Sequence, residues 1–193
     1  MNRYEIKCVN LPTNMTISQA LIQLKAFARQ DGAIVALIWT ASFAFTLLSP
    51  QLPWGSLLAI ATPFVIGWRL IRFRNYALGG VISFRRALAY SCYTFFYASV
   101  LFAVVQYLYF KFLDQGVLMQ LMNETAQVLL PVYKAQGLQE TDIREAISMF
   151  GSLTPIQLTF MFMMQNIFIG LLLSLPIAAV CTRKNRYGGQ KIK

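Results

Sequence analysis

The chain has 193 residues, of which 57% are hydrophobic and 12% are charged, and its formal net charge is +10. Soluble domains carry about 25% charged residues, so this composition excludes an ordinary soluble domain. The chain contains no histidine, which removes the usual general base and metal ligand. Its apolar residues are gathered in long blocks, which indicates a membrane protein.

Residues 16–29 (TISQALIQLKAFAR) have the pattern of an amphipathic helix. Thr16 and Gln19 fit a capping box, and Gly32 is placed to end the helix before the first apolar block. We expect this helix to lie on the cytoplasmic surface of the membrane; the alternative is a docking helix for a protein partner. Its apolar face comprises Ile17, Leu21, Leu24 and Ala28.

Four apolar blocks follow, at residues 33–48, 54–71, 88–110 and 155–180. A bilayer core of about 30 Å needs roughly 20 helical residues, so the first block is slightly short and the fourth must tilt or protrude. Helices are expected because lipid cannot satisfy a broken backbone, and the sequence has no run of alternating ten-residue strands. The sequence therefore predicts an all-α fold, an integral membrane four-helix bundle in one domain covering residues 1–193.

The third and fourth blocks contain polar side chains that a bilayer does not favour. Tyrosines in the third block recur at spacings of three and four, which places them on one helical face. This face either packs inside the bundle, with amides bonding between helices, or lines a groove for a lipid headgroup or small substrate. The residues concerned are Tyr90, Tyr93, Tyr97, Gln106 and Tyr107 in the third block, and Gln157, Gln165 and Asn166 in the fourth.

Between these two blocks, residues 111–154 are predicted to form two amphipathic helices. The first extends from Gly116 up to Pro131, and the second begins near Thr141 with acidic residues in its first turn. This helical hairpin either caps the bundle at the outer face of the membrane or receives a ligand.

Lysine and arginine are distributed unevenly among the connections. Segments 1–32, 68–87 and 181–193 hold 4, 5 and 5 of them, whereas the segments between hold 0 and 3. This positive-inside pattern predicts that both termini and the arginine stretch face the cytoplasm. The expected location is a bacterial inner membrane, with the 111–154 segment outside and a basic tail, 181–193, inside.

The arginine stretch (WRLIRFRNYALGGVISFRRALAY, 68–90) has two interpretations. The arginines set topology only, or they bind phosphate on an anionic lipid, because a guanidinium pairs with phosphate oxygens in two parallel hydrogen bonds. Gly79 and Gly80 allow the chain to turn there at positive φ. Nucleic acid is not expected as a partner, because no nucleic-acid motif accompanies the arginines. The candidate phosphate ligands are Arg69, Arg72, Arg74, Arg85 and Arg86.

No pattern for catalysis or a cofactor is present. The three cysteines lack metal-binding spacing, and there is no nucleophile elbow, phosphate loop or dinucleotide fingerprint. The four apolar blocks contain no Asp, Glu or Lys, the residues expected in proton relays. We therefore expect no enzyme activity, no metal and no cofactor.

The layout resembles a bacterial family known as domain of unknown function 4199. The resemblance rests on four apolar blocks, the turn NYALGGVISFRRALAYS, a long helical segment before the last block, and GLLLSLPIAAVCTRKN leading into a basic tail. It covers nearly the whole chain. It implies a small inner-membrane protein and supplies no catalytic residues.

Two functions are compatible with these features. The first is a non-enzymatic subunit or helper of a cell-envelope system that binds anionic lipid and a membrane protein partner, in a setting such as lipid-linked sugar or polyprenyl-phosphate metabolism. The second is a small transporter or flippase, assembled from several copies, in which the tyrosine and amide side chains line a path for a lipid headgroup or neutral substrate.

Overall fold

The computed structural model describes residues 17–49, 52–137 and 139–182. Thr16 and the tail beyond Thr182, for which the sequence makes predictions, lie outside these residues. The described chain forms six helices and no strand, so the all-α prediction is confirmed. The helices are α1 (Ile17–Leu48), α2 (Trp54–Ala77), α3 (Phe84–Phe112), α4 (Val117–Ala135), α5 (Glu140–Gly151) and α6 (Pro155–Cys181).

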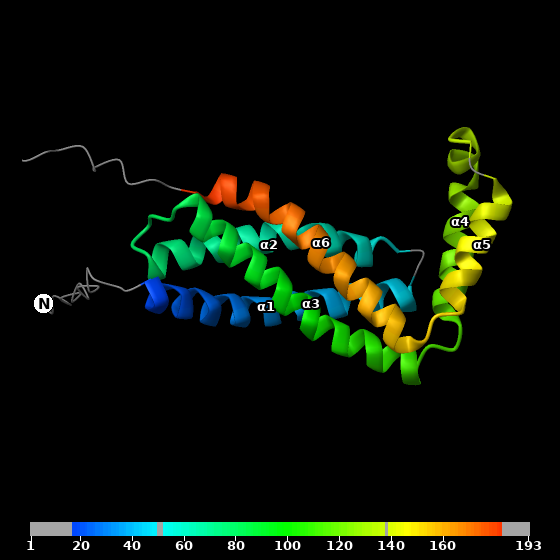
Figure 1. Ribbon diagram of the computed structural model, residues 1–193, viewed down its shortest axis with the longest axis horizontal. Coiled ribbons are helices and arrows are strands. Elements are labelled where there is room, and N and C mark those ends of the chain that lie inside the picture. The colour runs from blue at the N-terminus through cyan, green and yellow to red at the C-terminus, as the bar shows by residue number, and fades with distance from the viewer. Residues whose placement is uncertain (1–16, 50–51, 138, 183–193) are drawn as a thin grey trace, which may run out of the picture.

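Helices α1, α2, α3 and α6 are long and apolar enough to cross a membrane, as the sequence predicts. They lie side by side along the long axis of the molecule (Figure 1). Helix α3 packs against both α1 and α6, α1 also packs against α2, and α2 touches α6. Consistent with its central place, α3 has the longest series of buried residues, from Ala87 to Phe110.

The two ends of this bundle differ. Helix α1 begins, α2 is joined to α3, and α6 ends at one end (Figure 1); we call it the arginine end because residues 69–86 lie there. Helices α4 and α5 form an antiparallel hairpin that runs across the opposite end (Figure 1). We call this the hairpin end.

Glycines allow the bundle helices to approach one another closely. A Cβ atom on Gly170 of α6 would stand 2.6 Å from the Cβ of Phe95, and one on Gly32 of α1 would stand 2.8 Å from the Cβ of Tyr97. Such contacts are shorter than any side chain tolerates, so only glycine fits. The prediction that Gly32 ends a separate helix is therefore wrong: α1 continues through it without a break, because packing against α3 outweighs the low helix propensity of glycine.

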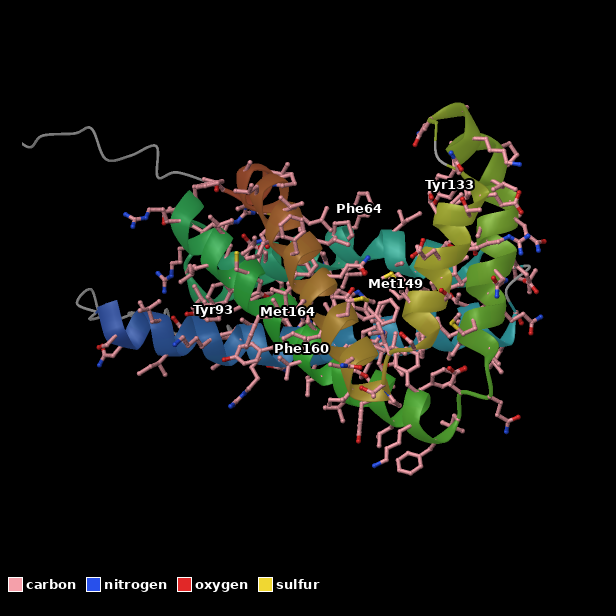
Figure 2. The ribbon with its side chains drawn as sticks, turned by 45° about the vertical axis from the view of Figure 1, so that its right-hand side comes forward. Phe64, Tyr93, Tyr133, Met149, Phe160 and Met164 are labelled. Atoms are coloured by element: carbon pink, nitrogen blue, oxygen red, sulfur yellow. The ribbon has the colours of Figure 1, made fainter. Side chains whose placement is uncertain are left out.

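The outer surface of the bundle is apolar, as expected of helices that face lipid. Phe64 of α2, and Phe160 and Met164 of α6, project outward from it (Figure 2). Their exposed fractions are 75%, 59% and 48%. Tyr93 lies instead along the seam between α3 and α1 (Figure 2).

The connections at the two ends contain glycines with left-handed backbone. Gly79 and Gly80 have φ values of 61° and 85°, which confirms the predicted turn, and the Gly80 N–H donates to the Arg74 carbonyl at 2.9 Å to close the end of α2. At the hairpin end, α4 continues through Pro131 to Ala135, beyond its predicted end. Neither α4 nor α5 contains a buried residue.

Candidate functional site at the arginine end

The arginine end contains a buried carboxylate held by two other helices. Asp31 of α1 is only 2% exposed. Arg69 of α2 donates to its Oδ1 from Nε at 2.6 Å and also from Nη2, and the hydroxyl of Tyr90 in α3 donates to Oδ2. Three helices therefore meet at one carboxyl group, and each oxygen of that group accepts a hydrogen bond.

Aromatic rings pack against this cluster. Phe73 of α2 stacks on Tyr90 with 5.0 Å between ring centroids and 12° between ring planes, and the ring centroids of Phe27 in α1 and Phe73 are also 5.0 Å apart. At 1.5 Å rise per residue, Tyr90 lies about 9 Å from the start of α3 and Arg69 about 12 Å from the end of α2. A charge so deep and so poorly exposed is stable only when paired.

Two of the five predicted phosphate ligands are engaged within the bundle. Arg69 is bound to Asp31, as described. Arg74 donates from Nη1 to the carbonyl of Cys181 at 2.9 Å, which satisfies the last residue of α6 and places a cation at the negative end of that helix.

The other three arginines have no carboxylate within ion-pair distance among the described residues. The Arg72 guanidinium lies 5.9 Å above the Trp68 ring and 5.6 Å above the Tyr76 ring. Arg85 is exposed. Arg86 is half-buried, and its Nη2 lacks a hydrogen-bond partner in the described part of the chain. Among the five candidate phosphate ligands, Arg72, Arg85 and Arg86 are therefore the ones whose positive charge is not compensated by a described carboxylate.

A hollow of about 360 Å³ opens beside the buried carboxylate, between α1 and α2. Aromatic rings form part of its wall and polar side chains form the rest. Its lining comprises Phe27, Gln30 and Asp31 from α1, and Arg69, Arg72, Phe73 and Tyr76 from α2.

The predicted tyrosine face divides along the length of α3. Tyr90 is buried in the carboxylate cluster. Tyr93 and Tyr97 stack on each other with 6.4 Å between centroids, and Lys25 of α1 lies 5.3 Å above the Tyr93 ring. These three tyrosines contact α1, whereas Tyr107 lines an apolar groove of about 580 Å³ between α3 and α6.

The predicted amides are also dispersed. Gln106 is 4% exposed and its Oε1 has no hydrogen-bond partner among the described residues. Gln157 accepts hydrogen bonds from the backbone and hydroxyl of Thr154, at 2.9 and 2.8 Å, and so caps the start of α6. Gln165 is exposed and Asn166 half-buried. Gln157 also lines the groove that contains Tyr107, between α3 and α6, whereas Gln106, Gln165 and Asn166 are not in the lining of that groove.

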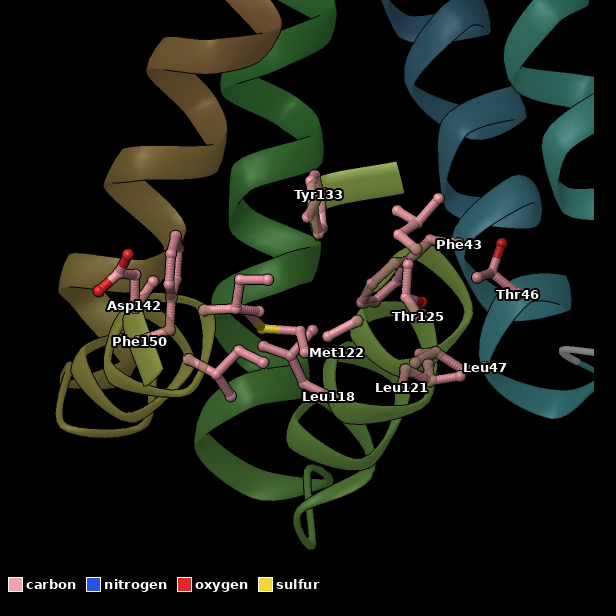
Figure 3. Close-up of a pocket in the computed structure, with 15 residues that line it drawn as sticks. Phe43, Thr46, Leu47, Leu118, Leu121, Met122, Thr125, Tyr133, Asp142 and Phe150 are labelled. Atoms are coloured by element: carbon pink, nitrogen blue, oxygen red, sulfur yellow. The ribbon is translucent and has the colours of Figure 1, made fainter. Parts of the chain in front are cut away.

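The hairpin end contains a second cavity, which is mainly apolar. It has a volume of about 570 Å³ and lies between the last turns of α1 and the facing sides of α4 and α5 (Figure 3). Phe43, Thr46 and Leu47 of α1 form one wall, and Asp142 is the only carboxylate in the lining. No group of three or more His, Cys, Asp or Glu residues suited to a metal occurs within residues 17–49, 52–137 and 139–182.

The sequence prediction missed Asp31, because this residue falls between the expected surface helix and the first apolar block. A signal was nevertheless present. The apolar spacing of Leu24 and Ala28 continues through Asp31 to Val35, and these four residues are 1%, 0%, 2% and 0% exposed. A carboxylate in the buried series of a continuous helix requires a cationic partner.

These features define a class: a helical membrane protein with four helices able to cross the bilayer. A family model described as protein of unknown function (DUF4199) matches residues 30–183. The chain therefore belongs to this family, as the resemblance in its sequence indicates. No curated protein and no solved structure matches it.

Proposed function

We propose that this protein is a non-enzymatic subunit or helper of a cell-envelope system in a bacterial inner membrane, with its arginine end on the cytoplasmic side. That end binds the phosphate of an anionic lipid, and the protein associates with a membrane protein partner. A pathway built on polyprenyl-phosphate lipids would present suitable phosphates at this face of the membrane.

The observation that carries the proposal is that, among the described residues, only two of the five arginines have partners that engage them within the bundle. Arg69 and Arg74 are engaged by Asp31 and the end of α6, whereas Arg72, Arg85 and Arg86 are not compensated by any described carboxylate. Positive charge next to the bilayer attracts anionic headgroups, and each residue contributes about 1 kcal/mol. The positive-inside distribution supports the orientation.

The lipid part of the proposal is tested by replacing Arg72, Arg85 and Arg86 together with lysine. Lysine keeps the charge and the topological signal but loses the two-pronged geometry of the guanidinium. We expect the triple variant to insert with unchanged topology, and to retain several-fold less anionic phospholipid than the wild type when extracted gently and weighed by native mass spectrometry. Equal lipid retention would show that the arginines act on topology alone.

The same measurement tests the partner. A reproducible heteromeric mass from the native membrane supports a subunit and identifies the partner directly. A homo-oligomer with no second protein contradicts the subunit proposal and favours the alternative of a transporter or flippase.

A further inference from the structure

The hollow between α1 and α2 brings a cation without a carboxylate partner next to an aromatic wall. Its volume of about 360 Å³ lies within the usual range for small-molecule sites, roughly 300–1,000 Å³. We propose that this hollow is the site at which the protein binds a single anionic lipid: Arg72 binds the phosphate, and the aromatic wall contacts the adjoining glycerol and first hydrocarbon groups. This inference rests on the proposed function and specifies where lipid binds.

The charges in the hollow favour one anionic group. Asp31 faces it, but this carboxylate is neutralised by two N–H groups of Arg69 and by the Tyr90 hydroxyl. Arg72 has no such partner, so the hollow has a net charge of +1. Asp31 therefore acts as a positioning residue, because it holds Arg69 in the bundle and leaves Arg72 as the cation that can bind a ligand.

The surroundings of Arg72 favour the binding of a phosphate. Its guanidinium lies within 6 Å of the ring centres of Trp68 and Tyr76, contacts that limit the freedom of the side chain without using its N–H groups as conventional donors. Gln30, exposed on the neighbouring face of α1, can supply an amide N–H as a further neutral donor. A phosphate in the hollow can thus accept two parallel hydrogen bonds from Arg72 and one from Gln30.

The walls indicate a lipid rather than free phosphate. Phe27 and Tyr76 contribute aromatic surface, with exposed fractions of 36% and 79%, whereas Phe73 is almost fully buried. Free phosphate gains nothing from this surface, whereas the groups that follow a lipid phosphate bury apolar area against it. The hollow also lies beside helices that are able to cross the bilayer, where a lipid can enter from the side.

The test uses the purified full-length protein and dioctanoyl phosphatidic acid as the probe, with binding followed by native mass spectrometry. Arg72→Lys should weaken binding about tenfold, because one bidentate charge-assisted pair is replaced by a point charge. Arg29→Lys is the matched control, since Arg29 is exposed on α1 at the same end but does not line the hollow; it should bind as the wild type does.

A second variant changes the wall of the hollow that α1 forms. Gln30→Trp adds bulk at an exposed position of α1 and should obstruct the hollow, so it should reduce binding to a similar degree while leaving thermal stability unchanged. Inorganic phosphate and dioctanoyl glycerol are the control ligands. Neither should displace dioctanoyl phosphatidic acid when added at the concentration at which that lipid saturates the wild type.

The outcomes distinguish an error in the assigned lipid site from an error in the proposed function. If Arg85→Lys or Arg86→Lys abolishes binding while Arg72→Lys does not, lipid binds at the start of α3; the hollow is then the wrong site and the proposed function stands. If the wild type does not bind the lipid at all, both fail. If inorganic phosphate displaces the lipid efficiently, the ligand is free phosphate and the assignment to lipid is overturned.

Discussion

The arginine end of the bundle and the α4–α5 hairpin use charge in opposite ways. At the arginine end a single carboxylate, Asp31, is buried and shared by three helices, and the surrounding rings are packed in contact. In the hairpin all five carboxylates from residue 114 to 145 are at least partly exposed, and no residue of α4 or α5 is buried. Buried contacts between helices stabilise the arginine end, whereas the hairpin is held by contacts among side chains that stay at least partly exposed.

The difference has a physical consequence for where function can be placed. Packed, fully paired groups hold a neighbouring side chain such as Arg72 in a defined position, which a selective binding site requires. An amphipathic hairpin without a buried core depends on whatever covers its apolar side. We therefore expect changes to the buried Asp31–Arg69 pair to alter both stability and lipid binding, and changes in the hairpin to alter mainly local order.

The largest effect is expected from breaking the buried ion pair. Asp31→Leu leaves the largely buried Arg69 side chain, which is 17% exposed, without its carboxylate partner and should lower the free energy of unfolding by up to about 3–5 kcal/mol. The double variant Asp31→Leu with Arg69→Leu should recover much of that loss, because no unpaired charge remains. Denaturation in detergent micelles measures both, with exposed Arg85→Leu as the control, expected to change stability by less than about 0.5 kcal/mol. Equal stability of Asp31→Leu and the wild type would contradict a structural role for the pair.

The next effect comes from the close contact between α3 and α6. Gly170→Ala introduces a Cβ at 2.6 Å from Phe95, and overpacking of this kind costs about 1–3 kcal/mol. Gly67→Ala is the matched control, because its Cβ would meet only the Cys181 sulfur at 3.9 Å, an ordinary contact distance. A scan of thermal unfolding should show a lower transition for Gly170→Ala only; if both variants unfold together, the helices are not packed as tightly as the structure indicates.

The same two regions show what a sequence can predict. The starts of α2 and α6 at residues 54 and 155 were located correctly, because proline and apolar blocks act locally and mark helix ends. The amphipathic pattern of α4 and α5 was also found, since it depends on spacing within one helix. Orientation in the membrane remains a prediction from charge alone.

The roles of individual charged residues could not be predicted from local sequence patterns. Asp31 and Arg69 are 38 positions apart, so no spacing rule connects them, and the five arginines look equivalent until the helices are assembled. Gly32 illustrates the same limit: next to a surface-helix pattern it resembles a terminator, and only the proximity of α3 shows that it allows close packing. The hollow and its exposed Arg72 follow from this assembly and could not be predicted before it.

A smaller effect is expected in the hairpin. Ile147 lies half-buried in the apolar cavity under α4 and α5, and Ile147→Ser should change global stability by no more than about 1 kcal/mol, because little of its surface is buried against the bundle. Hydrogen exchange in lipid nanodiscs should become faster throughout α4 and α5 and remain unchanged in α3. Glu145→Ser, on an exposed position of the same helix, should leave both unchanged. Faster exchange in α3 would show that the hairpin supports the bundle, contrary to the comparison.

The smallest effect concerns the junction between α4 and α5, where Glu140 binds Arg144 of its own helix at 2.8 Å and Lys134 of α4 at 3.3 Å. The hydrogen bond from Arg144, and then that from Lys134, lowers the pKa of the Glu140 carboxyl below its ordinary value of 4.5. Because the folded-state pKa is the lower one, this stabilisation is complete above the ordinary range and is lost as the pH falls through the folded-state value.

Glu140 is well exposed to solvent, so the change should be small and should weaken further in salt. Hydrogen exchange at the start of α5 should therefore increase slightly between pH 5 and pH 3 in the wild type, after correction for intrinsic rates, and remain flat in Glu140→Gln, where the pair is absent at every pH. An equal increase in both proteins would assign the change to other carboxylates of the hairpin.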